Sequence, residues 1–122
     1  MIQKRSKEKS MFPDIWDLNM GHVTAGEKSI EAAVREMNEE IGLTIQFHEM
    51  SFVDRIVRHD INHIIDIWKI KKDLDIRELE LKGDEVSEVK YVRKSELVSL
   101  LEDASNNRPY RPAEYIEAIR KM

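Results

Sequence analysis

The chain has 122 residues, of which 41% are hydrophobic and 36% are charged. This length and composition are typical of one globular domain with a real hydrophobic core, and they exclude a disordered or fibrous chain. The net charge of −4 creates no global field that would favour nucleic acid or an anionic membrane. Because the chain has no cysteine, disulfides, thiolate metal sites and cysteine nucleophiles are all excluded.

The sequence contains no apolar run of the roughly 20 residues that a membrane span needs. Residues 1–10 are rich in lysine and lack the apolar stretch of a signal peptide. We therefore expect a single domain over residues 1–122 in the cytoplasm. Its expected partner is a small molecule rather than nucleic acid or a membrane.

The segment from Met1 to Ser6 has the pattern of a strand that ends in a loop, and the sequence begins abruptly at this strand. An uncovered edge beside Met1-Ile2-Gln3 would present unpaired backbone groups to another chain. We therefore expect either a homodimer that completes the sheet across its interface or a truncated N-terminus. A frayed edge that is tolerated in a monomer is the alternative.

Residues 12–17 contain turn formers, after which Leu18 and Met20 alternate with polar residues as in a strand that ends at Gly21. A glycine at this point suits a close approach of the backbone to another group. Residues 29–41 then form the clearest predicted helix, with Ser29 as N-cap and Gly42 as the C-terminal stop. Its apolar positions at helical spacing are Ile30, Ala33, Val34, Met37 and Ile41.

The segments Thr44–Val53 and Ile61–Ile70 are rich in β-branched and aromatic residues, which predicts two strands paired as a hairpin. His59 and His63 fall at the loop between them, where we expect both to be solvated. The remaining elements are a strand with Val86, Val89, Tyr91 and Val92, a helix capped by Ser95 with Leu97, Val98, Leu100 and Leu101, and a last helix after Pro109 and Pro112 with Tyr115, Ile116 and Ile119. This order predicts one α/β domain.

Glu36, Glu39 and Glu40 lie along one flank of the predicted helix. Carboxylates three or four residues apart repel one another by a few tenths of a kcal/mol per pair, so the group needs either solvent or a cation. A solvated acidic face is one interpretation. A site for Mg²⁺ or Mn²⁺, which prefer hard oxygen ligands, is the other.

The residues around these glutamates favour the metal site. Gly21 is followed at fixed spacing by Glu27, by Arg35-Glu36-Met37, by Glu39-Glu40 and by Gly42-Leu43. This pattern resembles the Nudix box of the Nudix hydrolase superfamily at every defined position. The resemblance implies an α/β/α sandwich with a mixed sheet, of which an N-terminal strand would be missing here, and a hydrolase that cleaves phosphoanhydride bonds with Mg²⁺ or Mn²⁺.

By the same resemblance, the cation would be bound by Glu36, Glu39 and Glu40, with the Gly21 carbonyl and Glu85 as further ligands. One of the box glutamates, Glu39 or Glu40, would take the proton of the attacking water. Arg35 points away from Glu36 and Glu40 on a helical wheel, so we expect it to support catalysis through a salt bridge with Glu27. An ordinary surface arginine, and a surface turn residue at Glu85, are the alternatives.

Further residues resemble the segment that isopentenyl-diphosphate isomerase shares with the Nudix hydrolases closest to it. They are Lys4-Arg5-Ser6, Pro13, Trp16-Asp17 and Gly21-His22-Val23. The isomerase has its catalytic cysteine immediately before the glycine, where this chain has Met20. Because a thioether cannot add or remove a proton at carbon, the resemblance favours a hydrolase and not an isomerase.

Lys4, Arg5, Trp16 and His22 are the candidate substrate contacts. The two basic residues suit a phosphate group, and an indole can stack on a base or a prenyl group. The alternatives are a solvated terminus for Lys4 and Arg5, a core aromatic for Trp16, and a polar turn residue or metal ligand for His22.

The predicted activity is hydrolysis of a nucleoside diphosphate linked to another group, or of a related diphosphate, by a metal-activated water. A catalytically silent module that senses a nucleotide is the alternative. Such modules usually lose a box carboxylate, and all of them are present here. Removal of an RNA cap would call for a basic surface and an RNA-binding extension, and the sequence shows neither.

Overall fold

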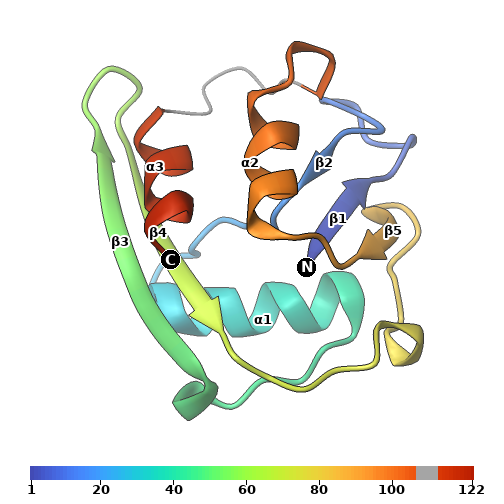
Figure 1. Cartoon of the computed structure of the whole chain (residues 1–122). Coiled ribbons are helices and arrows are strands. Elements are labelled where there is room, and N and C mark those ends of the chain that lie inside the picture. The colour runs from blue at the N-terminus through green and yellow to red at the C-terminus, as the bar shows by residue number, and fades with distance from the viewer. Residues whose placement is uncertain (107–112) are drawn as a thin grey trace.

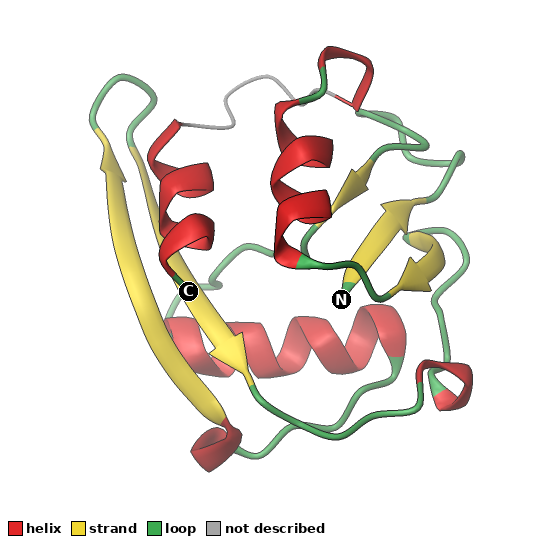
Figure 2. Cartoon of the chain, in the orientation of Figure 1, coloured by secondary structure: helices red, strands yellow, loops and turns green. Residues whose placement is uncertain are grey.

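The structure is a computed structural model that describes residues 1–106 and 113–122. The strands and α-helices, in chain order, are β1 (Ile2–Arg5), β2 (Trp16–Asp17), α1 (Ser29–Ile41), β3 (Met50–Arg58), β4 (His63–Ile70), β5 (Val86–Lys90), α2 (Lys94–Glu102) and α3 (Ala113–Lys121). The strands lie between α1 on one side and α2 and α3 on the other (Figures 1 and 2). The predicted α/β sandwich is confirmed.

Within the described residues the strands form two antiparallel sheets, one in the order β2-β1-β5 and the other the β3-β4 hairpin. β1 is the central strand of the first sheet. Gln3 pairs with Asp17 on one side and with Val89 on the other. The expectation of an uncovered edge at Met1-Ile2-Gln3 is therefore wrong, and the homodimer remains a prediction without that support.

The ends of α1 agree with the predicted range of residues 29–41. Gly42 adopts the left-handed conformation (φ 71°), and its N–H donates to the Asn38 carbonyl at 3.0 Å, which ends the helix as expected. The predicted N-cap is wrong by one residue, since Lys28 occupies that position. The Ser29 hydroxyl instead accepts a hydrogen bond from the indole of Trp68 on β4 at 3.2 Å, which joins the start of α1 to the hairpin.

The predicted hairpin is confirmed, but its first strand begins at Met50 and not at Thr44. Residues 47–49 form a 3₁₀ turn because the Glu49 carboxylate accepts a hydrogen bond from the Gln46 N–H at 2.9 Å. Such local bonds from a side chain to the backbone compete with strand pairing. His59 and His63 are both exposed as expected, although His63 is the first residue of β4 and not part of the loop.

Three smaller predictions change at element ends. Strand β2 stops at Asp17, which is buried, so Leu18 and Met20 do not continue a strand. Strand β5 stops before Tyr91 and Val92, and Ser95 lies inside α2, whose cap position is Arg93. The predicted last helix is α3, although Pro109 and Pro112 lie outside the described residues.

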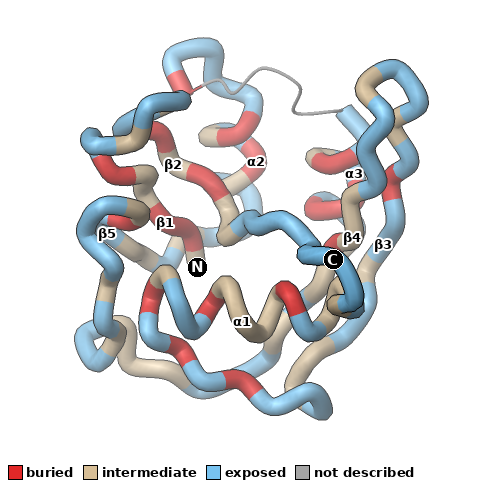
Figure 3. The backbone as a smooth tube through the Cα atoms, turned by 180° about the vertical axis from the view of Figure 1, so that it is seen from behind, coloured by how far each residue is buried: buried red, intermediate tan, exposed pale blue. Residues whose placement is uncertain are grey.

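The hydrophobic core has two parts (Figure 3). One lies between the hairpin and helices α2 and α3 and includes Ile67 and the fully buried Ile119. The other joins the C-terminal half of α1 to β5 and includes the fully buried Ile41 and Val86. Helix α1 therefore runs beneath both sheets (Figure 1), and its C-terminal half is fixed below β1.

A side chain covers the outer side of β2. The Asn106 amide accepts a hydrogen bond from the Trp16 N–H at 2.8 Å and donates one to the Trp16 carbonyl at 2.9 Å. The amide thus pairs with the backbone as a neighbouring strand would. Across residues 1–106 and 113–122, none of the helices has the length and apolar character that a membrane crossing requires.

Candidate active site

Helix α1 presents its glutamates toward β1 and the loop that follows β2. Glu40 is half-buried, whereas Glu39 is exposed. The segment before β5 is bonded to the end of α1, because the Lys82 N–H donates to the Glu40 carbonyl at 2.8 Å. The next turn brings Glu85 to the start of β5, where its carbonyl accepts a hydrogen bond from the Ser6 N–H. Glu40 and Glu85 thereby come to face the same space.

That space is a small cavity of about 20 Å³, large enough for one water molecule or ion. Its lining consists of Gln3, Arg5, Asp17, Leu18, Met20, Glu40 and Glu85. Burial raises the pKa of the Glu40 carboxyl above its usual range, and the nearby negative charges of Glu36 and Glu85 add to this effect. A hydrogen bond from Gln3 acts in the opposite direction. The cavity is therefore an acidic site that disfavours one more unneutralised negative charge.

Arg35 connects the helix to the loop before it. Its guanidinium donates two hydrogen bonds to Glu27, at 2.8 and 3.0 Å, which confirms the predicted salt bridge. These bonds, together with one from the Thr24 N–H, lower the pKa of Glu27 to about 2. A further bond runs from Arg35 to the carbonyl of His22 at 3.1 Å. The loop of residues 21–28 is thus held against α1.

Arg35 does not point away from the other glutamates, as the helical wheel suggested. Its Nη1 lies 2.9 Å from the Glu36 carboxylate and 3.2 Å from that of Glu39. A helical wheel gives only the direction in which each side chain leaves the backbone. A long flexible side chain such as that of arginine can bend back to reach the next residue. In this structure Arg35 therefore supplies the positive charge beside Glu36 and Glu39.

Gly21 passes directly over Glu36. A Cβ atom at position 21 would lie 2.3 Å from the Cγ and Cδ atoms of Glu36, so only glycine fits without movement of that carboxylate. This confirms the expected close approach at Gly21. It also places the main chain of Gly21 next to the Glu36 side chain, while the Gly21 carbonyl as a metal ligand stays a prediction.

The carboxylates suit a divalent cation by their chemistry, since Glu36 and Glu85 are both close enough to Glu40 for their charges to disfavour its ionisation. They do not converge on one point as expected. Among the described residues there is no group of three or more acidic or histidine side chains close enough to hold one metal ion together. Glu36 and Glu39 turn toward Arg35 instead, and Glu85 accepts a hydrogen bond from Lys9 at 2.5 Å.

The four predicted substrate contacts are not brought together. Arg5 lines the cavity, but its guanidinium donates to the carbonyls of Met11 and Phe12. Lys4 and Trp16 are not among the described cavity residues, because successive side chains of a strand point to opposite faces.

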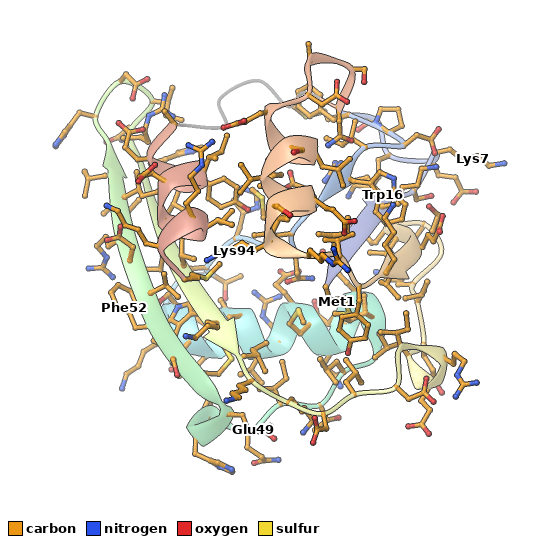
Figure 4. The ribbon with its side chains drawn as sticks, in the orientation of Figure 1. Met1, Lys7, Trp16, Glu49, Phe52 and Lys94 are labelled. Carbon is orange, nitrogen blue, oxygen red and sulfur yellow. The ribbon has the colours of Figure 1, made fainter. Side chains whose placement is uncertain are left out.

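On their own face, the Lys90 ammonium lies 4.2 Å from the centroid of the Trp16 ring, and that of Lys4 lies at 5.9 Å. Figure 4 shows the Trp16 side chain beside β1 and away from α1. His22 is exposed and contributes its carbonyl to the Arg35 network. The face of Lys4 and Trp16 is thus separate from the acidic cavity.

Two residues that bond to Glu40 were missed in the sequence. Gln3 and Asn19 both donate hydrogen bonds to the Glu40 carboxylate. The only sequence signal is that Gln3 and Arg5 are two residues apart on one strand, which places them on one face. That signal does not reveal which face meets α1.

The class of protein follows from the sandwich and from the acidic helix with its glycine loop. The family model described as the NUDIX domain matches residues 1–113, and the chain belongs to this family.

Individual proteins agree with this assignment. The chain is 38% identical over 101 residues to an uncharacterized Nudix hydrolase of Listeria innocua, a match that covers 82% of this chain and 59% of that protein. A shorter match, 44% identical over 46 residues, joins 38% of this chain to 16% of an m7GpppN-mRNA hydrolase of Xenopus laevis. The chain thus spans about three fifths of the length of the Listeria relative.

The fold is shared with a solved structure as well. The crystal structure of DR0079 from Deinococcus radiodurans superposes with a TM-score of 0.72 and 20% sequence identity, covering 98% of this chain and 72% of that one. At this identity the likeness concerns the fold alone.

Proposed function

We propose that the chain hydrolyses a phosphoanhydride bond in a nucleoside diphosphate linked to another group, or in a related diphosphate. The observation that carries the proposal is the position of Glu40 and Glu85 on one small acidic cavity, with Glu36 close enough to Glu40 to help raise its pKa. The relative named as an m7GpppN-mRNA hydrolase supports a substrate in which phosphates link nucleosides.

The proposed cofactor is Mg²⁺ or Mn²⁺. Glu36, Glu39 and Glu40 would hold it, with Glu85 and the Gly21 carbonyl as further ligands. When bound, the cation would neutralise charge on the phosphates and make a bound water more acidic. Because Arg35 Nη1 bonds to Glu36 and Glu39 in this structure, these two bonds would have to break for the two carboxylates to hold a cation.

The bonds of Arg35 to Glu27 and to the His22 carbonyl use other nitrogen atoms of the same guanidinium. They can therefore remain in place and hold the loop.

The reaction itself is a displacement at phosphorus. The water oxygen forms a new bond to phosphorus, the bond from phosphorus to the bridging oxygen breaks, and the leaving phosphate departs with the electron pair. Glu39 or Glu40 accepts the water proton. Arg35 keeps the loop in place through its bonds to Glu27 and the His22 carbonyl.

A substrate panel tests the proposal. The chain is incubated with nucleoside diphosphate derivatives and prenyl diphosphates, with Mg²⁺ or Mn²⁺, in water enriched in ¹⁸O. We expect phosphate products that carry one ¹⁸O atom, formed only when a divalent cation is present. Because Met20 stands where the isomerase has cysteine, we expect no interconversion of isopentenyl and dimethylallyl diphosphate. In a parallel incubation in deuterium oxide, we expect no solvent deuterium in either compound.

The panel also separates the alternative function. A compound that binds with micromolar affinity but yields no product under any cation would replace the hydrolase proposal with the nucleotide-sensing module. Glu117→Gln is the matched control for substitutions of the α1 glutamates, since the Glu117 carboxylate is exposed on α3 and pairs with Arg120 on its own helix. Its turnover is expected to equal that of the parent.

A further inference from the structure

Two side-chain amides meet at one oxygen of Glu40. The Gln3 amide donates to Glu40 Oε2 at 3.0 Å, and the Asn19 amide donates to the same oxygen at 2.8 Å. The Asn19 nitrogen also lies 3.3 Å from the Gln3 carbonyl oxygen. The three side chains form a closed network below β1, which we call the amide clamp.

Each amide of the clamp has one orientation that satisfies the network. An ionised carboxylate only accepts hydrogen bonds, so both amides must turn their nitrogen toward Glu40. Asn19 gives its second N–H to the Gln3 oxygen, which fixes the orientation of Gln3 as well. Gln3 is 7% exposed and lies on the central strand of its sheet, so its backbone is held on both sides. The clamp is therefore rigid.

Within the clamp, only one of the two Glu40 carboxylate oxygens receives the amide hydrogen bonds. Two amide hydrogens fill the lone-pair positions of Oε2, which leaves Oε1 for another partner. A glutamate has several freely rotating side-chain bonds, and a bond to one oxygen from two directions removes most of that freedom.

We propose that Gln3 and Asn19 are positioning residues that hold Glu40 so that its Oε1 is the oxygen presented to a divalent cation. This proposal rests on the proposed function, because it assigns the clamp to the same metal site. A merely structural role, in which the amides only satisfy a half-buried carboxylate, is the competing explanation.

Binding of Mn²⁺ alone separates the two explanations. The free Mn²⁺ concentration is followed by electron paramagnetic resonance in titrations of the parent, Gln3→Met, Asn19→Ala and the double variant. We expect each single variant to bind Mn²⁺ about tenfold more weakly, the usual effect of removing a group that orients a metal ligand. Because both amides act on one oxygen, the double variant should lose much less than the product of the two effects.

The same substitutions are then made together with Glu40→Gln. If the clamp acts through Glu40, neither Gln3→Met nor Asn19→Ala weakens Mn²⁺ binding any further in this background. Asn38→Ala is the matched control, since Asn38 is exposed on α1 and its amide faces Thr44. Asn19 is only half-buried, so its variant gives an answer even where Gln3→Met fails to fold.

Two results would overturn the role of the clamp. One is that the parent and the clamp variants bind Mn²⁺ with equal affinity. The other is a loss of affinity that persists in the Glu40→Gln background. A parent that binds no Mn²⁺ at all would remove the proposed metal site itself and the clamp's role with it, which is a different observation from either of the others.

Discussion

Substitution of Glu39 on α1 is expected to have little effect on the stability of the fold. It is exposed, and its one described partner is the Arg35 guanidinium at 3.2 Å. An exposed ion pair of this kind contributes little to stability. Glu39→Gln keeps the shape of the side chain while removing the charge that would bind a cation.

We predict that Glu39→Gln lowers turnover at least ~10²-fold on the best substrate of the panel and leaves the unfolding midpoint in urea nearly unchanged. Steady-state rates at saturating Mg²⁺ and a urea titration measure the two effects. Equal turnover in the variant and the parent would show that Glu39 takes no part in the reaction.

Gly21 offers a test of the main chain at the same site. In Gly21→Ala the new methyl group would lie 2.3 Å from Glu36, so the carboxylate has to move away. We predict at least ~10-fold lower turnover and weaker Mn²⁺ binding, since misplaced groups lose catalytic power steeply. The matched control is Gly83→Ala, because a Cβ at position 83 meets no atom within 4 Å. Similar losses in both variants would mean that the contact with Glu36 is irrelevant.

At the scale of single elements, the loop of residues 21–28 is attached to α1 by the ion pair of Glu27 and Arg35. Hydrogen bonds from Arg35, and from Thr24 to a smaller extent, lower the pKa of Glu27 from 4.5 to about 2. A carboxyl whose pKa is lower in the folded protein stabilises the fold fully above its unfolded pKa, and this contribution disappears as the pH falls through the folded pKa. The pH window is therefore 4.5 down to about 2.

We predict that the parent is more stable than Glu27→Gln by a constant margin from pH 7 to about 5, and that this margin shrinks as the pH falls from 4.5 toward 2. Urea unfolding of both proteins across this range measures the margin. A margin that is the same at pH 2.5 and pH 7 would be inconsistent with an ion pair as its source.

The elements also show how far the sequence alone can lead. The C-terminal end of helix α1 was predictable because its apolar spacing stops where Gly42 permits the left-handed turn, whereas the N-cap was placed one residue too late. The strand predicted from Thr44 was wrong because Glu49 bonds back to Gln46, a contact that composition does not reveal. The spacing of the box residues indicated the family, which the family model confirms, while their roles as metal ligands stay a prediction. The Gln3 and Asn19 amides could not, because they reach Glu40 only once β1 lies over α1.

For the molecule as a whole, the acidic cavity predicts a response to divalent cations. A ligand that binds only the folded state stabilises it by about 2.7 kcal/mol at a concentration 100 times its Kd. For a domain of this size that corresponds to roughly 10 °C in Tm. We predict such a rise in Tm with Mn²⁺, reversed by EDTA and absent for Na⁺ at equal ionic strength. A Tm that does not change with Mn²⁺ would contradict a metal site in the folded chain.

The amide of Asn106, which stands beside β2 in place of a strand, also makes the fold sensitive to chemical ageing. Its nitrogen donates to the carbonyls of Trp16 and Leu100, while its oxygen accepts from the Trp16 N–H. Slow hydrolysis of this amide to a carboxylate would turn a donor into an acceptor, and two main-chain oxygens would then face a negative charge in a buried place. Deamidation at this one side chain would loosen the attachment of β2 to the end of α2 without any change in the rest of the sequence.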